Sequence, residues 1–262
     1  IYTGEDTLSL HDALPIYTYV IAGDGCLMEG LSQEAIDLAG NLKLRRLIVL
    51  WDDNAITIDG ATSLSTATDQ LARFRASGWR ATRVDGHDPE AIAAAIEAAR
   101  KASRPTLIAC RTVIGKGAPT KAGSEKIHGA PLGEAEIAAA RAAAGWSAGP
   151  FEVPLPVLEA WRAAGSRHVA TRQAWETRLK RSRKAGTFRR AISGDLPAKF
   201  GEIFAAYKRE LILKKPKVAT RKASEMALGV INAAIPNTLG GSADLTHSNL
   251  TITPGLKDIA HR

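Results

Sequence analysis

The sequence predicts an α/β fold built on a doubly wound parallel sheet. Two observations support this prediction. Short apolar runs, of the length of buried strands, alternate along residues 17–149 with longer segments whose apolar positions repeat at helical spacing. The runs are apolar throughout rather than at every second position, which is typical of strands that helices cover on both faces.

The alternating segments follow one another in a regular order. We predict strands at 17–22, 47–51, 79–84 and 106–112, and helices at 29–42, 69–77, 90–102 and 134–144. The start of the third helix is well marked, because Asp88 can cap it and Pro89 suits its first turn. Residues 113–132 form a long glycine-rich loop, and loops of this length within a compact domain are often functional.

Beyond this first domain, residues 17–149, we predict a linker and the start of a second domain. Three prolines between residues 150 and 156 mark the boundary. Residues 150–217 are charged and helical in pattern. Residues 218–262 begin with an amphipathic helix at 219–236, and a short strand and glycine-rich turn follow within 237–251. We therefore expect the beginning of a second, incomplete α/β domain there.

The first sixteen residues do not fit this pattern. Residues 1–16 show no strand or helix period, and residues 6–16 match the translation of a common sequencing-library adapter. We exclude residues 1–16 from the fold as an artefact, together with His11, a tempting catalytic candidate. A divergent natural leader is the alternative, although its apolar content is too interrupted for a secretory signal.

The composition of the chain indicates which kinds of partner it can bind. The 262 residues carry a net charge of +8, and basic residues crowd between Arg167 and Lys222. Nucleic-acid binding is one interpretation, but we favour a solvated helical connector because no recognition motif or stacking aromatics accompany the charge. No apolar run is long enough to cross a bilayer. The two cysteines, Cys26 and Cys110, fit a reducing compartment. We expect a cytoplasmic protein without nucleic-acid or membrane partners.

Polar residues follow the first two predicted strands. Gly23, Asp24 and Gly25 come directly after one strand, and Asn54 follows the next. Parallel strands joined by one crossover end side by side, so Asp24 and Asn54 should face one crevice. Their oxygens suit Mg²⁺ that also binds phosphate, and Gly25 lets an anion approach the backbone. Gly-Asp-Gly alone is also ordinary turn chemistry, and the asparagine at crossover spacing is what favours a metal–diphosphate site.

Four stretches carry a family resemblance: GDGCLMEG, WDDNAITIDG, IHGAPLG and GGSADLTHSNLT. They resemble segments of the transketolase family. The resemblance implies the thiamine-diphosphate-binding fold, with thiamine diphosphate and Mg²⁺, or another divalent cation such as Ca²⁺, as cofactors. It implies a transferase that moves a two-carbon ketol unit from a ketose phosphate to an aldose phosphate in the pentose phosphate pathway. It also implies sugar phosphate substrates and a homodimer for the full-length protein.

The resemblance assigns roles to residues near the first crevice. Asp24, Asn54 and the main-chain carbonyl of Ile56 match the metal ligands of the family. Gly25 matches the glycine that lies against the cofactor diphosphate, and Asp52 matches a residue that orients the cofactor. These implied roles agree with the metal–diphosphate site that the strand ends predict.

The resemblance also assigns roles further along the chain. His128 in HGAPL matches a catalytic histidine that lies against the cofactor diphosphate and the reacting sugar, although a lone histidine is more often structural. Arg221 and Ser248 match residues that grip the substrate phosphate, for which a guanidinium fork is well suited. Asp244 matches an acidic residue near the thiazolium from the partner chain. His247 stands where the family usually has proline.

Some alternatives stay open at this point. Glu29 matches an acidic residue that links the two active sites of the dimer, but it also fits a plain acid at a helix start. A related thiamine enzyme, of the dihydroxyacetone synthase or deoxyxylulose-phosphate synthase type, is an alternative function, and a non-catalytic Mg²⁺ and diphosphate-binding module is another. Family segments expected upstream and downstream are missing, so we expect an inactive fragment.

Overall fold

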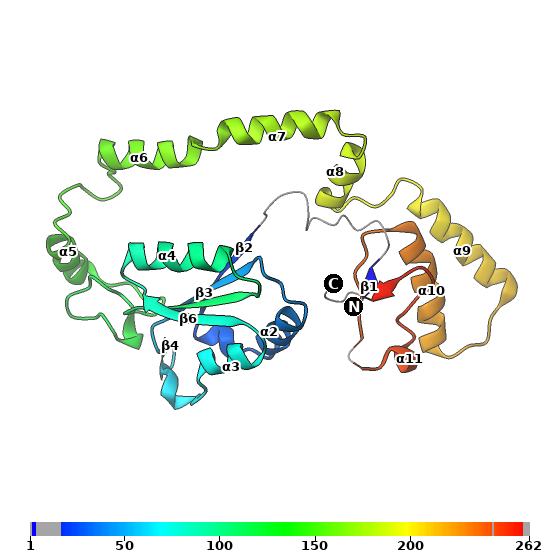
Figure 1. Cartoon of the computed structure of the whole chain (residues 1–262), viewed down its shortest axis with the longest axis horizontal. Coiled ribbons are helices and arrows are strands. Elements are labelled where there is room, and N and C mark those ends of the chain that lie inside the picture. The colour runs from blue at the N-terminus through cyan, green and yellow to red at the C-terminus, as the bar shows by residue number, and fades with distance from the viewer. Residues whose placement is uncertain (1, 4–16, 243, 259–262) are drawn as a thin grey trace. The chain divides into compact units, whose positions relative to one another are not determined.

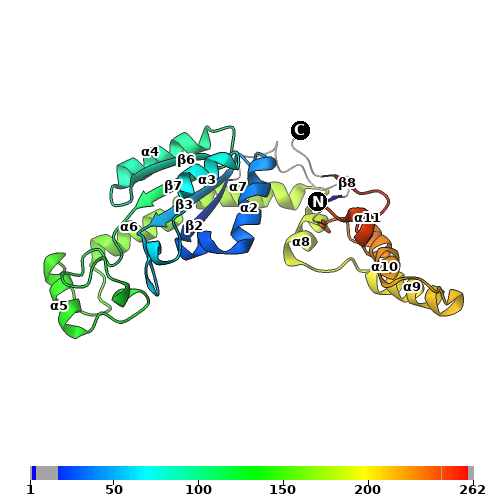
Figure 2. The same cartoon turned by 90° about the horizontal axis from the view of Figure 1, so that it is seen from below.

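The computed structural model describes residues 2–3, 17–242 and 244–258 of the chain. Its described residues form two compact units: the sheet unit, residues 17–152, and the helical unit, residues 2–3 and 153–258 (Figures 1 and 2). The domain limits expected from the sequence stay predictions. Most of the adapter-like segment, including His11, lies outside the described residues.

The sheet unit contains a sheet of four parallel strands. In spatial order they are β2 (Thr18–Gly23), β3 (Leu47–Asp53), β7 (Thr106–Arg111) and β6 (Arg80–Asp85). Each neighbouring pair runs parallel. All four carboxyl ends therefore lie at one edge of the sheet. The predicted α/β fold with a parallel sheet is confirmed.

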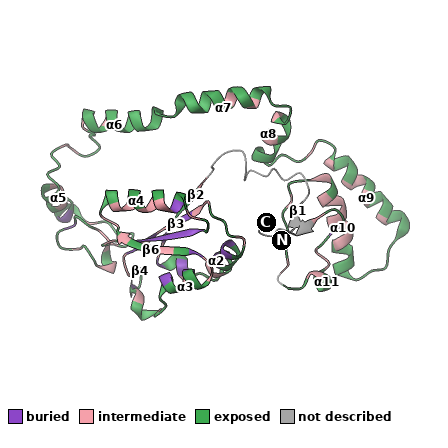
Figure 3. Cartoon of the chain, in the orientation of Figure 1, coloured by how far each residue is buried: buried purple, intermediate pink, exposed green. Residues whose placement is uncertain are grey.

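Helices cover both faces of this sheet (Figure 1). They are α2 (Gly30–Asn41), α3 (Gln70–Ala76) and α4 (Pro89–Arg100). Val49 and Trp51 of β3 belong to the core cluster that includes residues of α2 and α3, whereas Ile48 packs with Ala99 of α4. Neighbouring residues of a strand point to opposite faces, so one apolar run serves both layers. The buried residues concentrate in this unit (Figure 3).

The helix starts follow local capping chemistry. The Asp88 side chain accepts hydrogen bonds from the N–H groups of Glu90 and Ala91, and Pro89 begins α4, as predicted. Asp69 caps α3 in the same way through the N–H of Ala72. Both helices are thus positioned by acids that satisfy otherwise unpaired N–H groups.

Short elements complete the sheet unit. They are the 3₁₀ turns η1 (Gly25–Met28), η2 (Thr62–Leu64) and η3 (Glu125–Ile127), the hairpin strands β4 (Ile56–Thr57) and β5 (Gly60–Ala61), and helix α5 (Glu134–Ala143). The hairpin is antiparallel and begins directly after the polar end of β3. It therefore holds the chain at the carboxyl edge of the sheet.

The helical unit consists mainly of exposed helices. They are α6 (Leu155–Ser166), α7 (Val169–Arg181), α8 (Ala185–Ser193), α9 (Phe200–Lys214), α10 (Thr220–Ala234) and α11 (Thr246–Asn249). Strand β1 (Tyr2–Thr3) pairs antiparallel with β8 (Lys257–Asp258). No residue of these six helices is buried within the described chain.

The prediction of a short strand within 237–251 is wrong for the described residues. That stretch contains a single bridge residue, Gly240, and then the one-turn helix α11. A strand needs a hydrogen-bonded neighbour, and β8 in this unit pairs with β1 instead.

Across the described ranges, no helix combines the length and apolar character needed to cross a membrane.

Candidate metal and diphosphate site

The site begins where β2 ends. Asp24 follows β2 directly and is 8% exposed. Its Oδ1 accepts a hydrogen bond from Trp51 Nε1 at 3.3 Å, and its Oδ2 accepts one from the N–H of Ala55 at 3.1 Å. The parallel register pairs Gly23 with Asp52, which explains why the ends of β2 and β3 meet. The structure therefore brings Asp24 against the chain that leaves β3.

The chain leaving β3 makes a tight polar turn. Asn54 Oδ1 accepts a hydrogen bond from the N–H of Ile56 at 2.9 Å, an Asx-type turn around Ala55. Ala55 has φ +62°, a left-handed conformation that costs free energy for a residue with a Cβ. Asn54 Nδ2 donates to Asp52 Oδ2 at 3.0 Å, and Thr112 donates its hydroxyl to the other oxygen of Asp52. The turn is therefore held by its own internal hydrogen bond and by Asp52, which Thr112 fixes in turn.

Asp24 carries a charge that the fold does not fully compensate. Burial raises the pKa of Asp24 above the usual range of a carboxyl group, and the charges of Asp53 and, more weakly, Asp52 raise it further. The hydrogen bonds from Ala55 and Trp51 act in the opposite direction. A divalent cation beside this carboxylate would offset both the burial and the repulsion.

The available ligand atoms suit a hard cation that also binds phosphate oxygens. Asp24 offers a carboxylate, Asn54 an amide oxygen and Ile56 a main-chain carbonyl. The hydrogen bond from the N–H of Ala55 joins the Asp24 carboxylate to the turn that carries the other two. Mg²⁺ prefers such oxygen ligands and keeps positions for phosphate and water. Among the described residues, this turn included, no three His, Cys, Asp or Glu side chains cluster as a metal site, so the donor set here depends on an amide and a main-chain carbonyl beside one carboxylate. Apart from its chain neighbours, no described residue has an atom within 4 Å of a Cβ built on Gly25, so the backbone there is open to an anion.

The segment after Gly25 holds the next predicted residue, Glu29. Leu27 of η1 is buried, and its N–H donates to the carbonyl of Asp24 at 3.1 Å. Glu29 is exposed at the start of α2 and forms no capping hydrogen bond through its side chain. Both of its sequence-based interpretations stay predictions.

His128 lies in the long loop that follows β7. It is exposed, comes directly after η3, and its N–H donates to the carbonyl of Glu125 at 2.9 Å. The loop is anchored elsewhere, because the buried Glu136 carboxylate accepts hydrogen bonds from Thr120 and Lys121. No hydrogen bond within the described chain joins His128 to Asp24 or Asn54, so its role stays a prediction.

The remaining predicted residues belong to the helical unit. Arg221 is exposed in the first turn of α10. Ser248 and His247 lie in α11, and Asp244 precedes it with φ +64°. Asp244 and Ser248 are both exposed. Their predicted contacts with a sugar phosphate or a thiazolium stay predictions.

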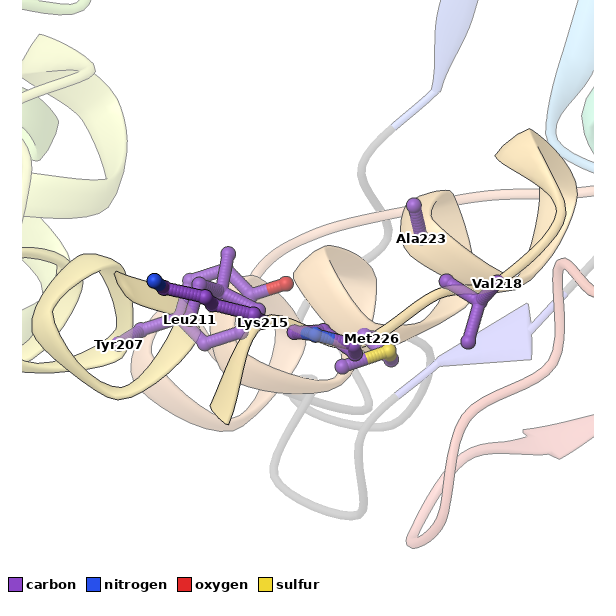
Figure 4. A pocket seen from close by; sticks show the side chains of 7 residues that line it. Tyr207, Leu211, Lys215, Val218, Ala223 and Met226 are labelled. Atoms are coloured by element: carbon purple, nitrogen blue, oxygen red, sulfur yellow. The ribbon is translucent and has the colours of Figure 1, made fainter. Parts of the chain in front are cut away.

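The helical unit has a groove of its own, with a volume of about 400 Å³ (Figure 4). It lies between α9 and α10 and is lined by Tyr207, Leu211, Lys215, Pro216, Val218, Ala223 and Met226. Its lining is mostly apolar and includes none of the predicted site residues. The polar turn after β3 is therefore the stronger candidate, because it gathers the ligands that the chemistry needs.

Sequence reasoning missed three residues that shape the site. Trp51 donates to Asp24, Thr112 donates to Asp52, and Asp53 is a buried carboxylate with 5% exposure. The run Asp52-Asp53-Asn54 in the sequence predicts that the strand ends in polar residues. Only the register between strands shows which of these side chains faces which partner.

Comparison with known proteins identifies the family. The family model described as "Transketolase, thiamine diphosphate binding domain" matches residues 4–197. This chain belongs to the transketolase family. The transketolase of Cereibacter sphaeroides is 59% identical over 249 residues, which cover 95% of this chain and 38% of that protein. The transketolase of Sinorhizobium medicae is 54% identical over 244 residues, covering 93% of this chain and 35% of that protein.

Solved transketolase structures share the fold. Transketolase from Campylobacter jejuni has a TM-score of 0.77 and 36% identity over 90% of this chain and 36% of its own. A transketolase complex with sedoheptulose-7-phosphate from Pichia stipitis has a TM-score of 0.78 and 37% identity over 91% of this chain and 36% of its own. This chain thus spans little more than a third of the length of the transketolases it matches.

Proposed function

We propose that this chain supplies the metal and diphosphate half of a transketolase active site. The reaction would move a two-carbon ketol unit from a ketose phosphate to an aldose phosphate. One observation carries the proposal: the buried Asp24 carboxylate is bonded to the Asn54–Ile56 turn at the carboxyl edge of two parallel strands. Membership of the thiamine-diphosphate-binding family supports the same conclusion.

The residues of the turn have distinct tasks in this proposal. Asp24, Asn54 and the carbonyl of Ile56 hold Mg²⁺, or a cation such as Ca²⁺, and Gly25 leaves room for the diphosphate. Asp52, fixed by Thr112 and Asn54, orients the cofactor. Thiamine diphosphate supplies, when bound, the thiazolium carbon that serves as nucleophile and electron sink.

Other residues bind the substrate in this proposal. His128 exchanges protons with the sugar hydroxyls, because an imidazole can act as both proton donor and proton acceptor. Arg221 and Ser248 bind the substrate phosphate, and Asp244 approaches the thiazolium. The Pichia stipitis transketolase solved with a sugar phosphate supports this class of substrate.

We also propose a cytoplasmic homodimer for the enzyme to which this sequence belongs. Cys26 and Cys110 are free thiols, which agrees with a reducing compartment. Sugar phosphates, rather than nucleic acids or membranes, are the proposed partners.

Calorimetric titration tests the metal role directly. The chain is titrated with Mg²⁺ in saturating thiamine diphosphate, and we expect saturable binding that D24A abolishes. D195A is the matched control, because Asp195 is an exposed carboxylate of the helical unit bonded to Ser193. Equal Mg²⁺ affinity in D24A and wild type would contradict the proposal. Ketol transfer to an aldose phosphate, assayed in parallel, separates binding from turnover.

A further inference from the structure

A row of charged side chains crosses the sheet beside the proposed metal site. Asp24 follows β2, Asp53 ends β3, Arg111 ends β7 and Arg83 lies in β6. The register pairs Asp53 with Arg111 directly. The row lies on one face, because Asp53 shares its face with Val49 and Trp51, which pack toward α2 and α3. Two acids thus stand next to two arginines at one edge of the sheet.

Asp53 is held by both arginines. Arg111 Nη1 lies 3.1 Å from Asp53 Oδ1 and donates to the main-chain carbonyl of Asp53 at 3.0 Å. Arg83 Nη2 lies 3.2 Å from Oδ2, an ion pair without hydrogen-bond geometry. The Asp53 side chain is 7% exposed, whereas the arginine side chains are 53% and 54% exposed. The carboxylate is therefore the fixed, buried member of this cluster.

The same contacts fix the chain that enters the metal turn. The carbonyl of Asp53 accepts from Arg111 and from the N–H of Thr112 at 3.2 Å. The next residue is Asn54, and after it comes the strained Ala55. A peptide bonded from two sides gives the strained turn a rigid starting point. The side chain of Asp53 is held toward β7 and β6, while Asp24 takes the other side of β3.

We propose that Arg111 and Arg83 are positioning residues of the metal site and act through Asp53. Both arginines draw a second carboxylate away from the cation, and Arg111 also locks the peptide from which the Asn54–Ile56 turn begins. This inference rests on the proposed metal role of Asp24 and Asn54. It assigns no direct contact with the metal, the cofactor or the substrate to either arginine.

The direction in which Mn²⁺ affinity changes when Arg111 is removed distinguishes a positioning role from a purely electrostatic one. The test measures Mn²⁺ affinity of the full chain in saturating thiamine diphosphate, from the electron paramagnetic resonance signal of bound and free Mn²⁺. Loss of an arginine that acts only through its charge would tighten cation binding, because like charges repel. Loss of an outer-shell positioning contact weakens metal affinity, typically by about tenfold or more. We expect R111A to weaken Mn²⁺ binding by about tenfold.

Further variants sharpen the test. R111K keeps the charge but loses the guanidinium Nη1 that contacts both the carbonyl and the Oδ1 of Asp53, so we expect a partial rescue. R83A provides the same test if R111A does not fold, because the contact that Arg83 makes with Asp53 is an ion pair without a hydrogen bond, and we expect a smaller loss of affinity in the same direction. The D53N/R111A double variant should lose no more affinity than R111A alone if the arginine acts through Asp53. R172A, which removes an arginine ion-paired to Glu176 in α7, is the matched control and should bind as wild type.

The outcomes distinguish the two proposals. A wild-type chain that binds no Mn²⁺ with thiamine diphosphate overturns the proposed function. A wild-type chain that binds, with folded R111A and R83A variants that bind equally well or more tightly, overturns only the positioning role. Weakened binding in both variants at temperatures where circular dichroism shows them folded, with R172A unchanged, supports it.

Discussion

At the scale of single residues, the candidate site contains features that destabilise the metal-free fold and favour ligand binding. Asp24 is buried beside Asp53, and Ala55 adopts a left-handed conformation. Neither feature favours the metal-free fold, and strain of this kind is concentrated at functional sites. A bound cation would attract these carboxylates and offset their repulsion, so the features that destabilise the metal-free fold are the ones that favour cation binding.

The pH dependence of stability tests this cost at Asp24. The pKa of Asp24 is raised in the folded chain, so the folded chain binds its proton more tightly than the unfolded chain. The destabilisation it causes is complete at neutral pH and is relieved as pH falls through the raised pKa. We therefore expect the melting temperature of metal-free wild type, relative to D24N, to rise between neutral pH and about pH 4. A difference that is constant with pH, measured by differential scanning calorimetry, would contradict this expectation.

At the scale of elements, Glu136 at the start of α5 anchors the loop that carries His128. Its carboxylate accepts the N–H and hydroxyl of Thr120, at 2.8 and 2.7 Å, and the N–H of Lys121 at 3.1 Å. The hydrogen bonds from Thr120 are the main cause that lowers the pKa of Glu136. The stabilisation is therefore present at neutral pH and is lost as pH falls below the usual glutamate pKa of about 4.3.

We expect E136Q to loosen this loop. Trypsin should cleave the variant several-fold faster than wild type at Lys116, Lys121 and Lys126, because fewer contacts hold the backbone. E134Q is the matched control, since Glu134 lies in the same helical turn without these loop contacts. Equal cleavage rates in the two variants would show that Glu136 does not anchor the loop.

Gly40 of α2 sits where two elements touch most closely. A Cβ at this position would lie 1.7 Å from the carbonyl oxygen of Ser77, the residue that ends α3. We expect G40A to lower the free energy of unfolding by about 2 kcal/mol, because α2 must shift from a packed neighbour. A Cβ at Gly30 in the same helix would meet no atom of another described element within 4 Å, so G30A should be tolerated. Urea unfolding of both variants checks the contrast, and equal stabilities would argue against the close approach.

The same scale shows what sequence patterns can predict. Apolar runs and capping residues predicted every strand of the parallel sheet and helices α2 to α5, because each signal is local. The proximity of Asp24 and Asn54 followed from the rule for parallel strand ends. The strand within 237–251 was wrong, and the Asp53–Arg111 pair went unseen. Both depend on which strand lies beside which, and no local signal contains that information.

At the scale of the whole molecule, charge is distributed unevenly. Residues 167–190 contain nine Lys or Arg and one Glu, so they carry +8, and the remaining 26 basic and 26 acidic residues cancel. The net charge of the chain thus resides in α7, α8 and their connections. The carboxyl edge of the sheet lies in the other, overall neutral, part of the chain, so cation binding there depends on local carboxylates rather than on a general field.

Burial is also uneven across the molecule, and the five tryptophans report on it. Trp51 and Trp79 of the sheet unit are 6% and 4% exposed, whereas Trp146, Trp161 and Trp175 are 40%, 74% and 38% exposed. Iodide should therefore quench one class of emission and leave a protected class. Trp51 Nε1 donates to the Asp24 carboxylate, so a cation there will change the emission of the protected class only. We expect Mg²⁺ with thiamine diphosphate to shift the iodide-resistant emission, and W51F to lose that shift while W161F keeps it. A shift confined to the quenchable class would place the binding event away from Asp24.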